Sequence, residues 1–261
     1  MLWPPRTAPE RRQRYSRRRF VLNEHMKRIL LGLAASACAL GVAAPIASAR
    51  LYELGESTVP VTTSCPDDCF VVTRTTALQV NTNGTTYPTT AKADGRVVAV
   101  TLQLGSLTDR QISFFNRTYG GTPRVQLTVL SQSSRQRPRR LYTATAQSEV
   151  FRITPFLGTT VQFPFETSLP IEKGDVVALT VPTWAPILAV NLDKTNGWRA
   201  SRASGCRDLL TQTAQQTIGN ESAYKCLYQT AKLTYTATMI STPKAPRETR
   251  EPARRETTTR R

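Results

Sequence analysis

Residues 171–186 read I-E-K-G-D-V-V-A-L-T-V-P-T-W-A-P, and this stretch decides the fold. A turn containing Gly174, which can take a positive φ, precedes a run of β-branched and apolar residues. Successive strand residues point to opposite faces, and neither face of residues 176–181 carries a charge. The pattern predicts an interior strand covered on both sides. Pro182 has no amide hydrogen for a ladder, so we expect the strand to end there and Trp184 to lie on a loop.

The rest of the chain supplies further short strands between polar turns. Strands are expected at residues 70–80, 98–104, 125–129, 149–153, 160–165, 187–192 and 233–239. Asn83-Gly84 predicts a tight turn, and residues 131–140 a basic polar loop. Residues 193–224 are long and polar, with one short helix expected near Leu209. About eight short strands without long helices predict an all-β fold, a two-sheet antiparallel sandwich of jelly-roll-like pattern.

The formal net charge of +17 is concentrated at the ends of the 261-residue chain. Residues 1–49 hold nine Lys/Arg and two acidic residues, and residues 243–261 hold seven and three. The body between them, with 19 basic and 13 acidic residues, is only mildly basic. Nucleic-acid-binding proteins concentrate basic side chains on a folded face, so no specific nucleic-acid partner is predicted.

The chain is expected to begin with an export leader. Met26-Lys27-Arg28 resembles a basic n-region, residues 29–44 are mostly apolar, and Ala47-Ser48-Ala49 fits an A-x-A cleavage site. Cleavage after Ala49 would leave Arg50 as the new N-terminus. A membrane-spanning helix is disfavoured, because the apolar run is short, contains glycine and is closed by a proline. We therefore expect a mature chain without a transmembrane segment, either secreted or in the extracytoplasmic cell envelope.

Residues 1–25 allow two interpretations. They are either untranslated sequence before a start at Met26, with a Sec signal, or the n-region of a twin-arginine leader built on S-R-R-R-F-V-L at 16–22. Either route exports the protein. The expected organisation is a leader at 1–49, an entry linker at 50–64, a β-sandwich domain at 65–242 and a disordered basic tail at 243–261.

Cysteine use agrees with export. With Cys38 in the leader, the four remaining cysteines predict two disulfides with three possible connectivities. We expect the local pairs Cys65–Cys69 and Cys206–Cys226. The second would close the polar segment and stabilise the fold by about 3 kcal/mol, because it lowers the loop entropy of the unfolded chain. A Cys₄ metal site is disfavoured by the C-x₃-C spacing, and no metal or cofactor is expected.

Catalytic chemistry is limited by the residue types present. The only histidine, His25, lies in the leader, so the mature chain has no histidine for a triad or a metal site. Four carboxylates on or beside strands could serve a glycoside hydrolase, namely Glu149, Glu166, Glu172 and Asp175. Their spacing marks no acid/base pair. We expect a protein that is not an enzyme.

Two tryptophans are the remaining candidates for a binding site. Trp184 and Trp198 are expected on loops, where exposed rings could stack on sugars while Asn196 and Arg199 bind hydroxyls. This predicts a glycan or cell-wall polymer binding module. Burial of both rings would favour the alternative, a structural or protein-interaction component of the envelope; a carboxylate-only glycan hydrolase is third. Asp193 with Asn191 and Asn196 could offer oxygen ligands to Ca²⁺, but a polar turn is the simpler interpretation.

The C-terminal residues 243–261 are charged, proline-containing and almost free of apolar side chains, so we expect them to be disordered. A basic tail could hold the protein to anionic wall polymers or lipid headgroups. The alternative is a solubilising tail without a partner.

Several segments together resemble a group of uncharacterised exported β-sandwich proteins of actinobacterial type. They are C-P-D-D-C at 65–69, G-R-V-V-A-V-T-L-Q-L-G at 95–105, Q-I-S-F-F-N at 111–116, K-G-D-V-V-A-L-T-V-P-T-W-A-P at 173–186 and the closing strand. The resemblance covers nearly the whole mature chain. The group carries no assigned activity, so it implies no site residues. The K-G-D strand is also similar to penultimate strands of secreted jelly-roll modules, which is an analogy of fold alone.

The leader generates a first prediction. Protein recovered from outside the cell should begin at Arg50, and intact-mass analysis measures this directly. A retained Met1 or Met26, or a lipid on Cys38, would contradict it.

Overall fold

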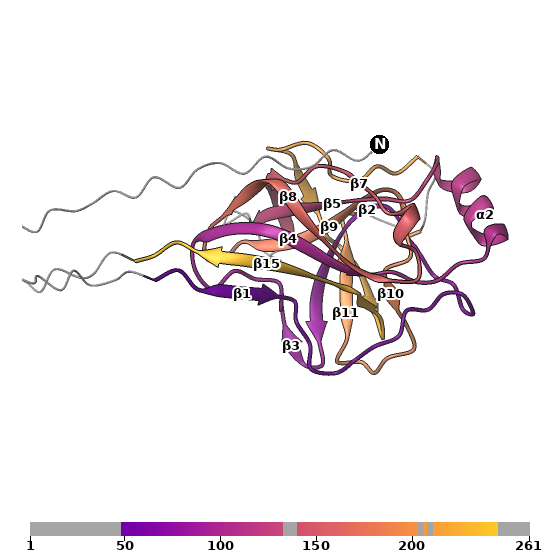
Figure 1. Cartoon of the computed structure of the whole chain (residues 1–261), viewed down its shortest axis with the longest axis horizontal. Helices are drawn as coiled ribbons and strands as arrows, with labels where there is room; N and C mark the ends of the chain where they lie inside the picture. The colour runs from indigo at the N-terminus through magenta and orange to yellow at the C-terminus, as the bar shows by residue number, and fades with distance from the viewer. Residues whose placement is uncertain (1–47, 133–139, 203–205, 208–210, 245–261) are drawn as a thin grey trace, which may run out of the picture. The chain divides into compact units, whose positions relative to one another are not determined.

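The computed structural model describes residues 48–132, 140–202, 206–207 and 211–244 (Figure 1). All of them belong to the compact unit Ala47–Arg261, one of the two into which the chain divides. The leader up to residue 47, most of the basic tail and the helix expected near Leu209 lie outside the described residues. The described part is an all-β antiparallel sandwich, so the predicted fold class is confirmed.

The larger sheet has β9 at its centre. Its strands follow the order β12-β6-β5-β9-β2-β11-β13, with β3 pairing to β2 and β7 to β5. Their bounds are β2 Val72–Thr82, β3 Thr85–Thr86, β5 Arg124–Gln132, β6 Leu141–Gln147, β7 Phe151–Arg152, β9 Val176–Ala185, β11 Gly197–Ala200, β12 Glu221–Ala223 and β13 Cys226–Gln229. Because β9 pairs with β5 on one side and β2 on the other, the predicted interior strand is confirmed.

The smaller sheet has the order β1-β15-β4-β8. Its strands are β1 Leu51–Leu54, β4 Gly95–Gln103, β8 Thr160–Ile171 and β15 Tyr235–Ser241, and a separate short ladder pairs β10 Leu188–Ala189 with β14 Lys232–Leu233. Strand β1 forms inside the segment expected to be an entry linker. The Ser241 N–H donates to the Arg50 carbonyl at 2.8 Å, so the chain enters and leaves the domain at the same end (Figure 1).

One apolar core lies between the two sheets. Val177, Leu179 and Val181 of β9 are fully buried in it, together with Val100 of β4 and Met239 of β15. Burying a side chain of this kind contributes roughly 1.5–3 kcal/mol. The alternation predicted for 233–239 is thereby confirmed, because the inward residues of β15 are buried and the threonines between them are more exposed.

The opposite face of β9 is also covered. Val176 and Ala178 pack with Tyr142 and Tyr224 in a second, smaller cluster. Tyr224 follows β12 at the end of the polar segment 193–224. That segment therefore folds back over the larger sheet.

A buried polar network lies on this covered face. The hydroxyl of Thr180 lies 2.9 Å from that of Thr76 on β2 and 2.7 Å from that of Thr128 on β5. Gln215 of the covering segment completes the network: its N–H donates to Thr76 Oγ1 at 3.0 Å, and its Oε1 accepts from the Tyr224 hydroxyl at 2.8 Å. Buried polar groups are stable in this setting because each has a partner.

Strand β9 does not end at Pro182, as expected, but continues to Ala185. The register with β2 shifts at Arg74 (φ 42°), where Pro182 and Thr183 lie opposite one residue. A bulge interrupts the ladder and therefore tolerates a proline. Trp184 consequently lies in a strand and not on a loop.

Besides β1, five strands lie where none was expected: β3, β6, β11, β12 and β13. Trp198 belongs to β11, so the expectation of a loop was wrong for this tryptophan too. Conversely, only Phe151–Arg152 of residues 149–153 and Leu188–Ala189 of residues 187–192 are strand.

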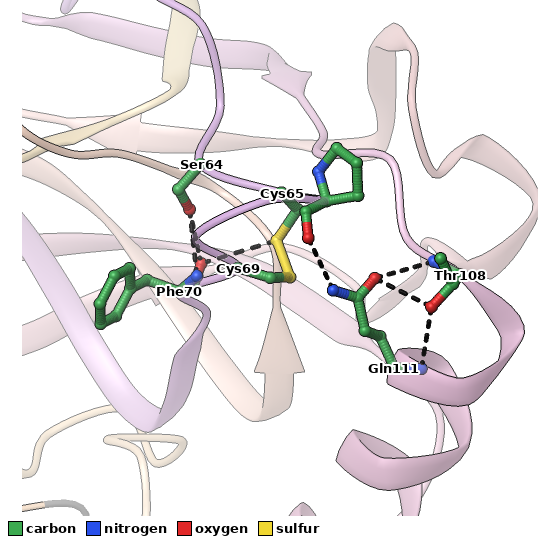
Figure 2. Close-up of a disulfide and its surroundings, with 7 residues drawn as sticks. Ser64, Cys65, Cys69, Phe70, Thr108 and Gln111 are labelled. Carbon is green, nitrogen blue, oxygen red and sulfur yellow. Dashed lines mark hydrogen bonds between the residues drawn. A yellow bond between two sulfur atoms is a disulfide. The ribbon is translucent and has the colours of Figure 1, made fainter.

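Helix α2 (Asp109–Tyr119) was not expected either. Thr108 and Gln111 form a capping box, in which each side chain accepts from the other's backbone N–H, and Gly120 ends the helix with a φ of 83°. Figure 2 shows that Gln111 Nε2 also donates to the Pro66 carbonyl, at 2.7 Å, and so joins the helix to the Cys65–Cys69 loop.

Both predicted disulfides are confirmed, Cys65–Cys69 and Cys206–Cys226. The second spans 20 residues and closes the segment that covers the larger sheet.

Replacing both cysteines of the Cys206–Cys226 bond with serine should lower the free energy of unfolding by about 3 kcal/mol, because the unfolded chain regains the closed loop's entropy. Urea denaturation measures the loss. The matched Cys65→Ser/Cys69→Ser variant, with its shorter loop, should lose about 2 kcal/mol; the reverse order would contradict the account.

Candidate functional site

Trp184 is completely buried. Its ring packs against Phe115 of α2 with centroids 5.1 Å apart. Its Nε1 donates to Asn116 Oδ1 at 3.1 Å and to the Gly121 carbonyl at 3.0 Å. The indole therefore attaches the helix to the larger sheet and offers no ring face to a ligand.

The other proposed binding residues also serve packing or backbone bonds. Trp198 is 5% exposed and stacks on Tyr228 with centroids 4.3 Å apart. Arg199 donates to two backbone carbonyls, at 3.2 and 2.9 Å. Asn196 is 2% exposed, and its Oδ1 accepts from the Asn83 N–H at 3.2 Å. The structure does not gather the four residues into one exposed surface, since three of them are buried.

The described residues hold no cluster of His, Cys, Asp or Glu that could bind a metal ion. Asp193, the residue considered for Ca²⁺, uses Oδ1 to accept from the hydroxyl and the N–H of Thr195. These hydrogen bonds hold the pKa of Asp193 below its usual value. Asp193 is thus the acceptor of a polar turn.

Two of the four carboxylates considered for a hydrolase accept hydrogen bonds from the backbone N–H groups of the other two residues. Glu149 Oε1 accepts from the Glu166 N–H at 3.1 Å, and Asp175 Oδ2 accepts from the Glu172 N–H at 3.1 Å. None of the four lines the pocket described below.

The side of the smaller sheet that faces away from the core is rich in hydroxyl and amide groups. This outer face carries Leu51, Glu53, Arg96, Thr101, Gln103, Gln162, Thr236, Thr238 and Ile240. Thr236 and Thr238 donate to the two carboxylate oxygens of Glu53. Gln162 Nε2 donates to the hydroxyls of Thr101 and Thr238, at 3.3 and 3.4 Å. These bonds hold the side chains in place within the fold, and a prearranged surface loses less entropy when it binds a partner.

One end of the outer face is hollowed. Residues 55–61 and the start of β15 border a cavity of about 230 Å³, called the pocket from here on. Its lining combines an apolar wall from residues 59–61 with polar side chains, which are Glu56, Ser57, Thr101, Gln103, Thr160, Lys232, Thr234 and Thr236.

Lys232 is the cation of this pocket. Leu233 and Tyr235 point into the core, so alternation directs Lys232 and Thr234 to the opposite side, where they line the pocket. Lys232 is only 6% exposed, and burial lowers the pKa of its ammonium group. Within the described residues, that ammonium has neither an ion pair nor a hydrogen bond. Sequence analysis missed Lys232, although its place in the alternating row before β15 was a usable signal.

Comparison of the chain with protein-family models, curated proteins and solved structures finds no match, so the resemblance to exported actinobacterial proteins stays a prediction. Among the residues in the structure, no helix is long and apolar enough to cross a membrane.

The burial of the tryptophans generates a stability prediction. Trp184→Ala and Trp198→Ala should each lower the free energy of unfolding by about 3–5 kcal/mol, because a large buried ring is removed. Trp184→Phe should lose only about 1–2 kcal/mol, since it keeps much of the packing but loses the indole hydrogen bonds. Chemical denaturation gives these values. Phe114→Ala, at a ring 52% exposed on the same helix, is the control and should change stability by less than about 0.5 kcal/mol.

Proposed function

We propose that the protein is a non-catalytic extracytoplasmic module that binds a hydroxyl-rich polymer, a glycan of the cell wall or surroundings, on its outer face. The observation that carries the proposal is the row of prearranged hydroxyl and amide groups that leads into the pocket. The two disulfides and the leader-like N-terminus support a location outside the cytoplasm.

The oxygen acceptors that remain available on the pocket wall suit sugar hydroxyls. Thr234 Oγ1 donates to the Gln103 carbonyl at 2.6 Å, and Gln103 Nε2 donates to the Val61 carbonyl at 3.0 Å. These donors are used within the fold, while lone pairs on the Thr234 hydroxyl and the Gln103 Oε1 stay available. A ligand that brings its own O–H donors therefore complements this wall.

The energetics favour a polymer over a single sugar. A hydrogen bond contributes roughly 0.5–1.5 kcal/mol net, and neither Trp184 nor Trp198 presents a ring for stacking. A short oligosaccharide making three or four such bonds should bind with a Kd on the order of 1 mM. Useful retention would come from repeated contacts along a polymer.

The second candidate is a protein-interaction role in the envelope. Burial of both tryptophans favours it, and so does an apolar pair at the far end of the outer face. Leu51 and Ile240 are cross-strand partners, 71% and 40% exposed. A partner protein could bury this pair together with the polar face.

A bulky substitution at the pocket tests the proposed function. Thr160 lines the pocket and is exposed, so Thr160→Trp should obstruct it and weaken binding to any glycan retained in an array at least tenfold. Thr167→Trp makes the same change on an exposed residue of β8, about 20 Å along the strand, and should leave binding unchanged. No retained glycan, or equal retention by both variants, would contradict binding at this site and favour the protein-interaction role.

A further inference from the structure

The pocket contains a positive charge that no residue described in the structure neutralises. Lys232 is 94% buried, as its 6% exposure implies, and the described residues give its ammonium no ion pair or hydrogen bond. The Lys232 Nζ is not among the buried polar atoms without a partner, so the ammonium is accessible from the pocket while the methylene stem is covered. Buried titratable groups of this kind concentrate at functional sites.

The other residues that line the pocket indicate which kind of ligand group would bind this cation. Thr234, Thr236 and Gln103 already donate to groups within the fold, so the pocket wall offers oxygen acceptors. Lys232 is then the charged donor of the pocket, and none of the described residues accepts a hydrogen bond from it. Glu56, the carboxylate in the lining, forms no ion pair with it.

The charge and the size of the pocket limit the ligand. One lysine and one glutamate line it, so a group with a single negative charge is favoured over a dianion, which Glu56 would repel. The cavity of about 230 Å³ is smaller than the roughly 300–1,000 Å³ of pockets for drug-sized ligands, which fits one sugar unit of a longer chain.

We infer that the pocket recognises one uronic acid unit of an acidic saccharide, whose carboxylate accepts hydrogen bonds from the Lys232 ammonium while its hydroxyls donate to the threonine and glutamine oxygens. This inference rests on the proposed function and adds the ligand class. It makes Lys232 the residue that separates acidic from neutral glycans.

The first experiment changes only the ligand. Tetragalacturonate and its methyl ester have the same backbone and hydroxyls, but the ester lacks the charge. In NMR titrations of the purified chain at low salt, the acid should bind at least tenfold more tightly than the ester. A second titration compares two monosaccharides, galacturonic acid and glucose 6-phosphate. The phosphate tests whether the pocket prefers a phosphate to a carboxylate, and it should bind more weakly than galacturonic acid.

The second experiment changes only the lysine. Lys232→Met keeps the length of the side chain and removes the charge, so the acid and the ester should bind this variant equally. Its thermal unfolding temperature should change little, because methionine covers much of the apolar surface that the lysine stem covers. Lys173→Met removes the same charge from an exposed turn and should keep the preference for the acid.

The outcomes separate the two proposals. Equal binding of the acid and the ester by the unsubstituted chain would overturn the uronate inference and leave glycan binding intact. Binding of neither, with no neutral glycan retained in an array, would overturn both. Tighter binding of the phosphate, or an equal loss in both lysine variants, would overturn the assignment of a carboxylate to Lys232. If Lys232→Met failed to fold, the acid and ester comparison on the unsubstituted chain would still decide the inference.

Discussion

The hydroxyl of Thr180 contacts threonines on both neighbouring strands, and the centre of the larger sheet depends on this buried contact. A hydroxyl in that position is stable only when water is excluded and each partner is hydrogen-bonded. Gln215 and Tyr224 meet both conditions, because one completes the network and the other covers it. The polar segment that carries them therefore shields this network, and the Cys206–Cys226 bond closes the segment.

The predictable part of the fold was the part in which side-chain alternation reports burial directly. The uncharged run from Val176 and the row from Leu233 were placed correctly for this reason. The end of β9 was misplaced because Pro182 lies in a bulge, and a bulge depends on the partner strand and not on local sequence. Helix α2 was overlooked although Thr108 and Gln111 carried a capping-box signal. Strand β11 was overlooked because four residues between polar turns show no period.

The candidate site shows the same limit. Trp184 and Trp198 were singled out by residue type, but their exposure is decided by α2 and Tyr228, which are distant in sequence or were not foreseen. Lys232 was not singled out, since a lysine near a strand is ordinarily solvated. Only the fold reveals that residues 55–61 line the same pocket as Lys232. Lys232 was thus harder to single out from the sequence than Trp184 or Trp198, because its surroundings in the fold, and not its residue type, make it a candidate.

The paired ends of the domain have a practical consequence. Arg50 and Ser241 are hydrogen-bonded at one end of β15, while the pocket lies beside Tyr235 at the other end, roughly 20 Å away at 3.4 Å per residue. A fusion partner, surface display scaffold or immobilisation tag joined at either end of the domain would therefore sit far from the pocket.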